Sequence, residues 1–467
     1  MAARTWSRLG RVFLLTMWLT APGIVRAAGV ENTPVSPEAA ITGGAVVASD
    51  DPGGGGWYNP ASLAAVERSY VSVGASVYSI SSYVIKDALT TELPWATLTG
   101  DLSGTRYVSV PAVVCYTFRV REGLGLSLGV WTPVHSAYSA TVTDASSGPV
   151  PGYPALTASY LATYSVFVAS DDTWAAAAVG WQVLPTLRLG LSLGGLYGTR
   201  DASVDLAASL STDSTDPSAS GGLVQVMVRT NSSIFGLRSV LGLQWEVTPS
   251  LRVAATVRSP TVGLNGPGSS SSRTTSAALL LPGQPPLQHQ QVELLGPSQS
   301  LSEIEPVRLS GGLAWSQGDV RLLLDGDWQP ALERRLTGRR SIWELRAAAV
   351  WRKDANTTLG LGLFRQADPG IASQGSLAID EIGLAAGVDY RPWRVVEALG
   401  GGKAWDMRVT VAARAAYGSG LGPGLLIVPF DWSSSRIPFF PGQSSTFLEV
   451  PARFLGGQLS LFTTVTF

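Results

Sequence analysis

The sequence has few of the side chains on which disulfides, metal sites and nucleic-acid binding depend. Its single cysteine, Cys115, excludes an intramolecular disulfide framework, and its two histidines, His135 and His289, form no cluster at zinc-binding spacing. Charged residues make up 14% of the 467 residues, whereas soluble domains have about 25%. The formal net charge of −1 leaves no basic excess for nucleic acid. We expect no metal, no cofactor and no nucleic-acid partner.

Long apolar runs are also scarce, and the clearest one, residues 12–19, lies close to the N-terminus. Arginines precede it, and helix breakers and small residues follow it, which is the order of a secretory signal. We expect cleavage after Ala27, so that residues 1–27 are a signal peptide. The alternative, an uncleaved anchor, is disfavoured because the run is shorter than the roughly 20 residues of a spanning helix. An exported chain with little charge and no helical spans is a secreted β-protein or a transmembrane β-barrel.

Alternation along the chain and the lengths of the connections distinguish these two classes. Leucines at positions 187, 189, 191 and 193 alternate with small or polar residues, as in a strand with one apolar face. A soluble sandwich alternates as well, so the connections decide. Short connections alternate with long polar segments along the chain, which is typical of an outer-membrane barrel with short periplasmic turns and long outer loops. The long loops are expected at about 86–102, 135–165, 200–222, 261–304, 328–341, 367–380 and 419–452.

The apolar segments predict fourteen strands and therefore an all-β, antiparallel transmembrane barrel over residues 68–467. An even number places both chain ends on the periplasmic side. Fourteen strands enclose a lumen wider than side chains alone can fill, and the inward positions are expected to carry few charges. The strands are expected near 69–85, 104–118, 123–134, 168–183, 186–199, 223–246, 250–260, 305–316, 319–329, 341–352, 357–367, 381–391, 405–418 and 453–467.

Residues 43–66 precede the first strand and lack strand alternation. They contain the glycine run Gly53, Gly54, Gly55 and Gly56, which permits close approach of one chain segment to another. Asn59 is a good N-cap and Pro60 suits the first helical position, so a short helix with Leu63 on its packed face should follow. We expect residues 28–67 to form a hatch that enters the lumen from the periplasm. Two roles are open for it: simple packing, or rearrangement of the glycine run on ligand binding.

Several motifs resemble the long-chain fatty-acid outer-membrane transporter family (FadL-like). Gly43-Gly44-Ala45 and the segment Tyr58-Asn59-Pro60-Ala61-Ser62-Leu63-Ala64 are similar to its N-terminal hatch. Residues 183–190, 247–253 and 258–260 are similar to its turn-and-strand pattern. The terminal Phe467 resembles the aromatic end that barrel-insertion machinery reads. The four glycines and Ser62 depart from the family pattern, which leaves the identity of the ligand open.

The resemblance implies passive diffusion of hydrophobic molecules such as long-chain fatty acids through a plugged barrel, with a sideways exit through the third strand. Pro133 falls in or at the end of that strand, and because proline cannot donate a ladder hydrogen bond, it could open the wall or merely end the strand. The expected partners are apolar small molecules, outer-membrane lipid and the barrel-assembly machinery, and we expect a monomer in the outer membrane of a Gram-negative-type bacterium. The candidate residues of the path are Gly53, Gly54, Gly55, Gly56, Trp57, Asn59, Pro60, Ala61, Leu63, Gly129 and Pro133.

Three other functions remain possible from the sequence. A general diffusion porin or a structural barrel would share the strand pattern. An outer-membrane lipid hydrolase would need a serine, a histidine and an orienting partner at one rim. His135 and His289 both fall in predicted outer loops, but no G-x-S-x-G motif accompanies them. We therefore expect no enzymatic activity and no catalytic residue.

Overall fold

The computed structural model describes residues 33–51, 53–93, 95–150, 153–213, 222–265, 268–277, 290–295, 305–332, 338–372, 377–395, 405–427 and 446–467. The predicted signal peptide, residues 1–27, lies outside these ranges. Two short helices, α2 (Pro37–Thr42) and the 3-10 helix η2 (Pro60–Ala65), precede the strands. The strands are β1 (Tyr70–Leu93), β2 (Ala96–Arg121), β3 (Leu124–Val150), β4 (Tyr153–Leu184), β5 (Leu187–Thr212), β6 (Gly222–Thr248), β7 (Leu251–Arg258), β8 (Val262–Asn265), β9 (Gly268–Ala277), β10 (Gln290–Leu295), β11 (Arg308–Gln317), β12 (Val320–Gln329), β13 (Ile342–Arg352), β14 (Thr357–Ala367), β15 (Ala378–Val395), β16 (Trp405–Ile427) and β17 (Thr446–Thr466).

Within the described ranges, no helix is both long enough and apolar enough to cross a membrane.

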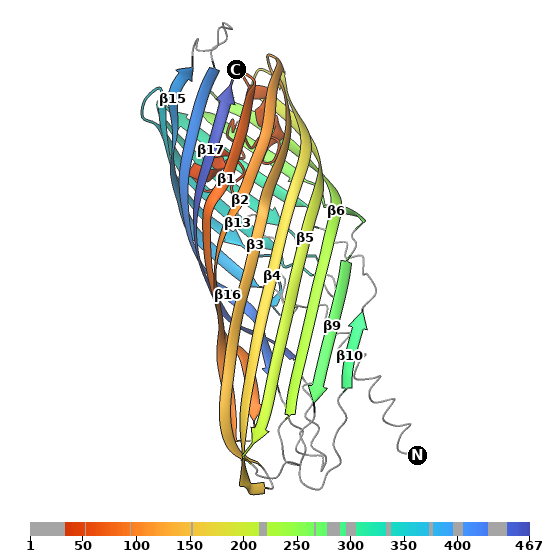
Figure 1. Ribbon diagram of the computed structural model, residues 1–467. Helices are drawn as coiled ribbons and strands as arrows, with labels where there is room; N and C mark the ends of the chain where they lie inside the picture. Colours follow the sequence, from red (N-terminus) through yellow and green to blue (C-terminus); the bar gives the residue numbers. More distant parts are fainter. Residues whose placement is uncertain are drawn as a thin grey trace.

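Fourteen of the described strands, β1–β7 and β11–β17, form a closed antiparallel ring (Figure 1). Each pairs with the next along the chain, β7 pairs with β11, and β17 returns to β1 in a register that begins at Tyr70↔Thr466. Strands β8 and β9 extend the wall beside β6, and β10 pairs with β9. The predicted fourteen-stranded antiparallel barrel is confirmed.

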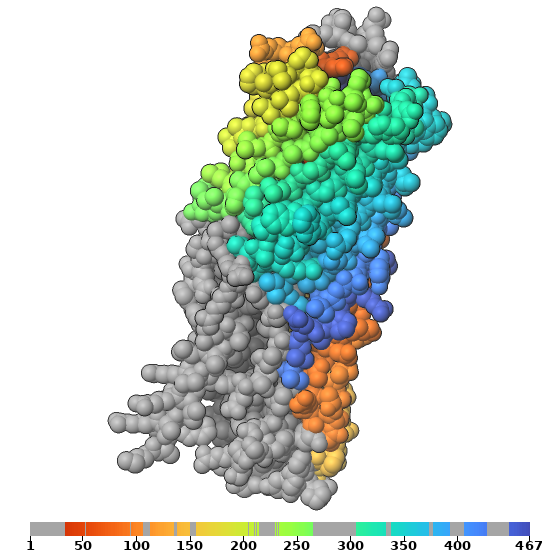
Figure 2. All heavy atoms as spheres, turned by 180° about the vertical axis from the view of Figure 1, so that it is seen from behind, coloured from red at the N-terminus to blue at the C-terminus, as the bar shows by residue number. Residues whose placement is uncertain are grey.

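The alternating leucines lie on the outer face of the ring. Leu189, Leu191 and Leu193 are exposed, whereas Ser192 between them is buried on the inner face. A closed ring satisfies the backbone hydrogen-bonding groups of every strand, and an apolar outer face suits hydrocarbon. Seen from behind, β11–β15 run obliquely across the barrel and complete its wall (Figure 2).

Several segments that were expected to be loops are strands. Residues 86–93, 96–102, 135–150, 153–165, 200–212 and 419–427 continue β1, β2, β3, β4, β5 and β16, and parts of 261–304 form β8, β9 and β10. The 32 residues of β4 span about 105 Å at 3.3 Å per residue, although roughly 9–11 residues suffice to cross a membrane. The prediction was wrong because many outward residues here are serine and threonine, which made these strands look like polar loops.

The inner faces of these long strand ends pack together. Buried apolar side chains from β1–β5 and from β14–β17 form one hydrophobic cluster, in which Tyr138, Tyr164 and Phe454 are among the largest members. We call the part of the barrel around this cluster the distal half, because it lies away from the end that carries the C-terminus (Figure 1). Its apolar interior explains why strands with a hydroxyl-rich outer face are stable there.

The other half of the lumen is not poor in charge, contrary to the expectation. Arg308 and Arg346 form a buried network of ion pairs with Asp327 and Glu344. Buried charges persist when each has a partner of opposite sign. Strand alternation places these residues inside the barrel, and β12 and β13 each carry more than one charge in the inward phase, a signal that was overlooked.

Candidate ligand path

The charged half of the barrel contains residues 33–66, which we call the N-terminal segment (Figure 1). Helix α2 packs against β13–β17 and η2 packs against β3–β6, so that the segment reaches opposite walls of the ring. Most of its described side chains are buried, among them Val35, Ala45, Trp57 and Leu63. The lumen at this level is therefore occupied by the chain itself.

Helix η2 begins where the sequence predicts. The Asn59 side chain accepts a hydrogen bond from the Ala61 amide at 3.0 Å, and Pro60 occupies the first helical position. The helix is a single 3-10 stretch that ends at Ala65, and Leu63 is buried. It lies so close to the wall that a Cβ added at Gly190 would come within 2.2 Å of the Pro60 carbonyl carbon. The approach of backbone to backbone therefore requires glycine in β5.

Helix α2 is capped at both ends. Ser36 Oγ accepts a hydrogen bond from the Ala39 amide at 3.1 Å, and Gly43 ends the helix with a φ of +65°, a conformation that favours glycine. The helix then meets the wall at β14, where a Cβ at Gly362 would come within 2.1 Å of the Thr42 oxygen. Both helices of the segment thus dock on glycines of the barrel.

Polar contacts tie the stretch between the two helices to the wall. Asp325 Oδ2 on β12 accepts hydrogen bonds from the amides of Val46 and Val47, at 2.6 and 2.8 Å. Asn59 Nδ2 donates to the Val47 oxygen at 2.8 Å, and Gln244 on β6 donates to the Ser49 oxygen at 2.8 Å. These bonds satisfy backbone groups that would otherwise be buried without partners.

The glycine run is packed on every side. A Cβ added at Gly53 would lie 2.8 Å from Pro37, and one added at Gly54 would lie 2.3 Å from Asp51. A Cβ added at Gly55 would lie 2.7 Å from Ser62, and one added at Gly56 would lie 2.9 Å from Trp131. None of these four glycines adopts a positive φ. The run is needed for close packing rather than for an unusual backbone conformation. Its rearrangement on ligand binding remains a prediction.

Trp57 connects the segment to three strands. Its ring lies 5.9 Å from that of Trp174 on β4. The Arg238 guanidinium on β6 lies 4.6 Å from the Trp57 ring centroid and 3.9 Å from that of Trp174, and Arg258 on β7 lies 4.7 Å from Trp57. Cation–π contacts of this kind strengthen when they are shielded from water. Arg238 is also paired with Glu305 at 2.9 Å.

The ladder of paired residues in the wall beside the segment is interrupted between β2 and β3. Their pairing runs from Arg121↔Leu124 to Val113↔Trp131 and is found again only at Ser103↔Thr141, so the described backbones of 104–112 and 132–140 do not pair with each other. The ladder between β3 and β4 has a register shift between Trp131 and Val134. Pro133, which lacks an N–H, lies at this irregularity. Pro133 does not end its strand, because β3 continues to Val150, and the opening of a path at this irregularity stays a prediction.

The N-terminal segment borders this interruption. The Thr33 amide donates to the Pro133 oxygen at 3.2 Å. The Trp131 indole N–H and the Cys115 thiol both lie 3.4 Å from the Gly53 oxygen, as donors. A Cβ at Gly129 would come within 2.6 Å of the Trp131 ring. Gly129, Pro133 and the glycine run, which are distant in sequence, therefore meet at one place.

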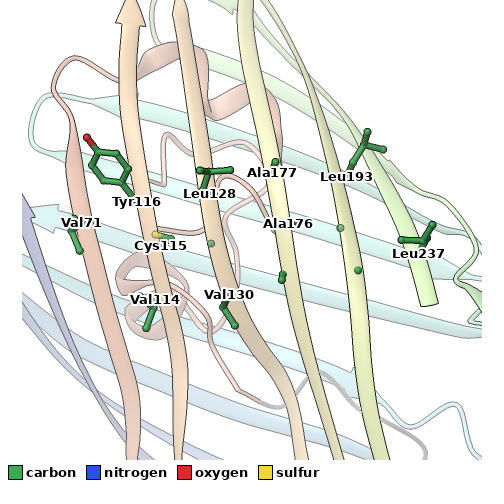
Figure 3. A pocket seen from close by; sticks show the side chains of 14 residues that line it. Val71, Val114, Cys115, Tyr116, Leu128, Val130, Ala176, Ala177, Leu193 and Leu237 are labelled. Carbon is green, nitrogen blue, oxygen red and sulfur yellow. The ribbon is translucent and has the colours of Figure 1, made fainter. Parts of the chain in front are cut away.

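The outer face of the same strands carries an open groove of about 690 Å³. Figure 3 shows Val114, Leu128, Val130, Leu193 and Leu237 around it. Its floor is made of small residues of β3, β4 and β5, namely Gly129, Ala175, Ala176, Ala177, Gly194 and Gly195. The apolar groove thus lies on the outer side of the wall at the edge of the strand interruption.

The carboxyl group of Asp51 is buried inside the segment, where it accepts hydrogen bonds from the Ser36 hydroxyl and the Gly53 amide. Burial, and next the nearby Glu38 carboxylate, raises the pKa of Asp51 to about 7. The folded segment therefore binds this proton more tightly than the unfolded chain, whose pKa is about 3.9, and its stability should fall as pH rises between these values.

We expect Asp51→Asn to remove this part of the pH dependence. The variant should gain stability on the order of a few kcal/mol relative to wild type at pH 8, with a smaller difference at pH 4. Hydrogen exchange of the amides of α2, measured at both pH values in the detergent-solubilised protein, reports the local opening of the segment. If the difference in stability between Asp51→Asn and wild type is the same at pH 8 and pH 4, Asp51 is not the source of this pH dependence.

All the predicted path residues of the N-terminal segment are buried. Trp131 lies between Gly129 and the glycine run, whereas Pro133 is bonded to Thr33. Asp325, Trp174, Arg238 and Arg258 were missed. Trp131, which was not among the predicted path residues either, is buried against the glycine run. Its phase in β3 was a usable signal, because it shares the inward face with Gly129. His289 lies outside the described residues, as does the side chain of His135.

In fold, the chain is similar to a FadL homologue from Pseudomonas aeruginosa, with a TM-score of 0.57 and 11% identity over 94% of this chain and 99% of that one. A TodX deltaS2S3 mutant monoaromatic hydrocarbon channel matches with a TM-score of 0.52 and 12% identity, over 93% and 99% of the two chains. The P. putida toluene transporter TodX matches with a TM-score of 0.50 and 12% identity, over 88% and 93%. No protein-family model and no curated protein matches the sequence. The predicted resemblance to FadL-like proteins is confirmed at the level of the fold.

Proposed function

We propose that this chain, which has the fold of FadL-type barrels, is an outer-membrane channel for passive diffusion of apolar small molecules. The observation that carries the proposal is the N-terminal segment, which occupies the lumen where the wall between β2 and β3 is interrupted. A plug at that level separates two compartments, and a break in the wall beside it offers an apolar solute a way into the bilayer. The outer groove next to the break is lined by leucine, valine and alanine.

Within this proposal, residues 28–67 act as the hatch, residues 68–467 as the barrel, and residues 1–27 as the export signal. Phe467 serves as the signal for the barrel-assembly machinery. In the structure its backbone N–H donates to the Ser69 oxygen at 2.9 Å, next to the closing pair of β17 and β1. The chain acts as a monomer in lipid of the outer membrane and has no enzymatic activity.

The candidate substrates are long-chain fatty acids and aromatic hydrocarbons, and one experiment ranks them. Uptake of a labelled long-chain fatty acid is measured in cells that produce the protein, with and without excess toluene. Saturable uptake that depends on the protein supports transport, and inhibition by toluene indicates that one path serves both classes. A steadily open ion conductance of the wild-type protein in a planar bilayer would instead favour a porin, because a plugged lumen blocks ions.

Replacing Pro133 by valine tests the sideways exit. Valine supplies the missing amide donor and favours a regular ladder, so uptake of the labelled substrate should fall about fivefold or more if the break is the exit. Heat-modifiable migration on gels checks that the barrel folds. Val134→Ile, which changes the next position of the same strand without adding a donor, is the matched control. Unchanged uptake in the folded valine variant would remove Pro133 from the mechanism.

A further inference from the structure

The distal ends of β1 and β2 form a hairpin that leaves the wall of the barrel. β1 pairs with β17 as far as Ile85, and none of its later residues in the described chain pairs with β17. Distal to the strand interruption, β2 pairs with β3 at Ser103 alone, and no described residue of 96–102 pairs with β3. Residues 88–93 and 95–100, which we call the tip hairpin, therefore pair with neither of the strands that flank β1 and β2 in the rest of the ring.

The tip hairpin pairs with β16 instead. In parallel orientation, Leu89, Thr90 and Thr91 are paired with Leu425, Leu426 and Ile427. Leu425 and Leu426 are at the same time paired with β17. Because a strand has only two hydrogen-bonding edges, the tip hairpin must lie along the edge of β16 that faces away from β17. β1 has therefore crossed the width of both β17 and β16.

This crossing takes place on the inner face of β16. A Cβ added at Gly422 would lie 3.1 Å from Ile85 Cγ2, and one added at Gly424 would lie 3.5 Å from the Asp87 oxygen. Both glycines continue the inward phase of the buried Ala416. Seen from behind, the tips of β1 and β2 (orange) lie directly below β16 and β17 (blue) (Figure 2). β1 therefore passes through the lumen before it reaches the far edge of β16.

The two faces of the tip hairpin differ in polarity. Ala88, Leu89 and Leu93 have exposed fractions of 0, 0 and 8% and belong to the hydrophobic cluster of the distal half. Glu92 and Thr97 on the other face are exposed. The tip hairpin thus turns an apolar side toward the interior of the barrel and a polar side toward water.

Side-chain packing, without a ladder, joins the tip hairpin to β3. A Cβ added at Gly100 would lie 2.4 Å from Val142 Cγ2. Trp95 lies against Gly148, and its indole N–H donates to Ser146 Oγ at 3.3 Å. The tip hairpin therefore spans the distal interior from β16 to β3, and its contacts with β3 can separate without breaking a β-ladder.

The tip hairpin begins at an irregular bend in β1. Asp87 has a φ of +50° and is the one non-glycine residue with a positive φ in the described part of the chain. The pairing with β2 shifts there from Ile85↔Leu102 to Leu89↔Gly100, so that three residues of β1 lie opposite one residue of β2. An irregularity of this kind bends a strand.

Asp101 holds this bend in place. Its carboxylate accepts a hydrogen bond from the Asp87 amide at 3.0 Å and forms an ion pair with Lys86. Both side chains of the ion pair are exposed to solvent, so they contribute little to stability. A positive φ at an aspartate persists only where the surrounding contacts favour it. Asp87 can therefore act as a hinge between the ring and the tip hairpin.

We propose that the tip hairpin is a lid that closes the distal end of the lumen and opens by a change of backbone conformation at Asp87. The proposal rests on the transport function proposed above and adds a second barrier, at the end of the lumen opposite the hatch. Opening breaks the three parallel pairs with β16 but leaves the ladder between β17 and Tyr70–Ile85 intact. An apolar solute that covers the uncovered apolar surface favours the open state.

The first test measures opening without transport. Ala162→Cys is made together with Cys115→Ala as a reporter, because Ala162 has an exposed fraction of 0% and is paired with Asp144, which lies against Gly100 of the lid. The rate at which a water-soluble thiol reagent labels this cysteine is measured in the purified full-length mature protein in detergent. A closed lid predicts slow labelling.

Two variants of the hinge change this rate differently. Asp87→Val should raise it about tenfold, because a β-branched residue disfavours a positive φ. Asp87→Asn is the matched control, since it removes the same charge but tolerates a positive φ, and it should label as the reporter protein does. Equal labelling rates in the valine and asparagine variants would overturn the lid.

The second test locks the lid. Thr90→Cys and Leu426→Cys are combined with Cys115→Ala. Paired strands lie about 4.7–4.9 Å apart, within the range of about 4.4–6.8 Å for the Cα atoms of natural disulfides. The oxidised protein should take up the labelled fatty acid into cells at least about tenfold more slowly than the reduced protein. Full uptake by the oxidised protein would overturn the lid as a barrier.

The two tests separate the lid from the transport function. If the wild-type protein takes up no substrate while Asp87→Val labels faster than Asp87→Asn, the lid stands and transport is rejected. If substrate uptake depends on the protein but labelling is the same in both variants, transport stands and the lid is rejected.

Discussion

Replacing Gly190 by leucine is expected to turn a barrel that blocks ions into one that conducts them steadily. The new Cβ would come within 2.2–2.5 Å of backbone atoms of Pro60 and Ala61, which no rotamer change can relieve. Overpacking of this kind costs about 1–3 kcal/mol or more, and the N-terminal segment can escape it by leaving the wall. Conductance in a planar bilayer should rise from near zero to that of an open pore.

The control for this prediction is Gly311→Leu. Gly311 lies in β11 on the outer face and has no atom within 4 Å of an added Cβ, so leucine there should change neither conductance nor folding. If Gly190→Leu folds and still blocks ions, η2 does not close the lumen. The hatch assignment would then have to be abandoned for residues 59–65.

Locking the glycine run to the wall is expected to abolish uptake. A Cβ at Gly56 lies 3.5 Å from that of Ala178 on β4, within the 3.5–4.5 Å of natural disulfides. The double variant Gly56→Cys, Ala178→Cys is made with Cys115→Ala, so that the native thiol cannot interfere. If the run must move for passage, the oxidised protein should transport at least about tenfold more slowly than the reduced one.

The reduced form of this triple variant is its own control. Reduced protein that transports as wild type shows that the packing of Trp131 beside Gly56 tolerates the new side chain. Full uptake by the oxidised protein would contradict movement of the glycine run and leave it a packing role.

Strand alternation made the barrel predictable. Leucines at every second position of β5 point outward, and tight turns fix the ends of most strands on the side of the C-terminus. The same rule failed in the distal half, where Thr141 and Thr143 face outward and Ala140 and Val142 face inward. Where the outer face meets water, its residues are polar, and only the inward residues are apolar at every second position.

The candidate path was predictable in part. Asn59 and Pro60 predicted the start of η2, because helix capping depends only on residues that are neighbours in sequence. The contact of Asp325 with the Val46 and Val47 amides joins residues nearly 280 positions apart and depends on the register of the whole ring. Likewise, Pro133 marked a weak point in one strand, but the interruption involves β2 as well, where Pro111, two positions beyond Val113, was not recognised as a second signal.

The length of β3 and β4 determines where an apolar solute first meets this protein. Because these strands continue far past the hydrocarbon layer, the mouth of the barrel stands well above the membrane, and its outer surface there is coated with hydroxyl groups such as those of Thr141, Thr143 and Ser159. An apolar solute would therefore first meet the protein in the aqueous phase outside the membrane. The inner faces of the strands over that distance carry apolar side chains, among them Tyr138, Tyr164 and Phe454.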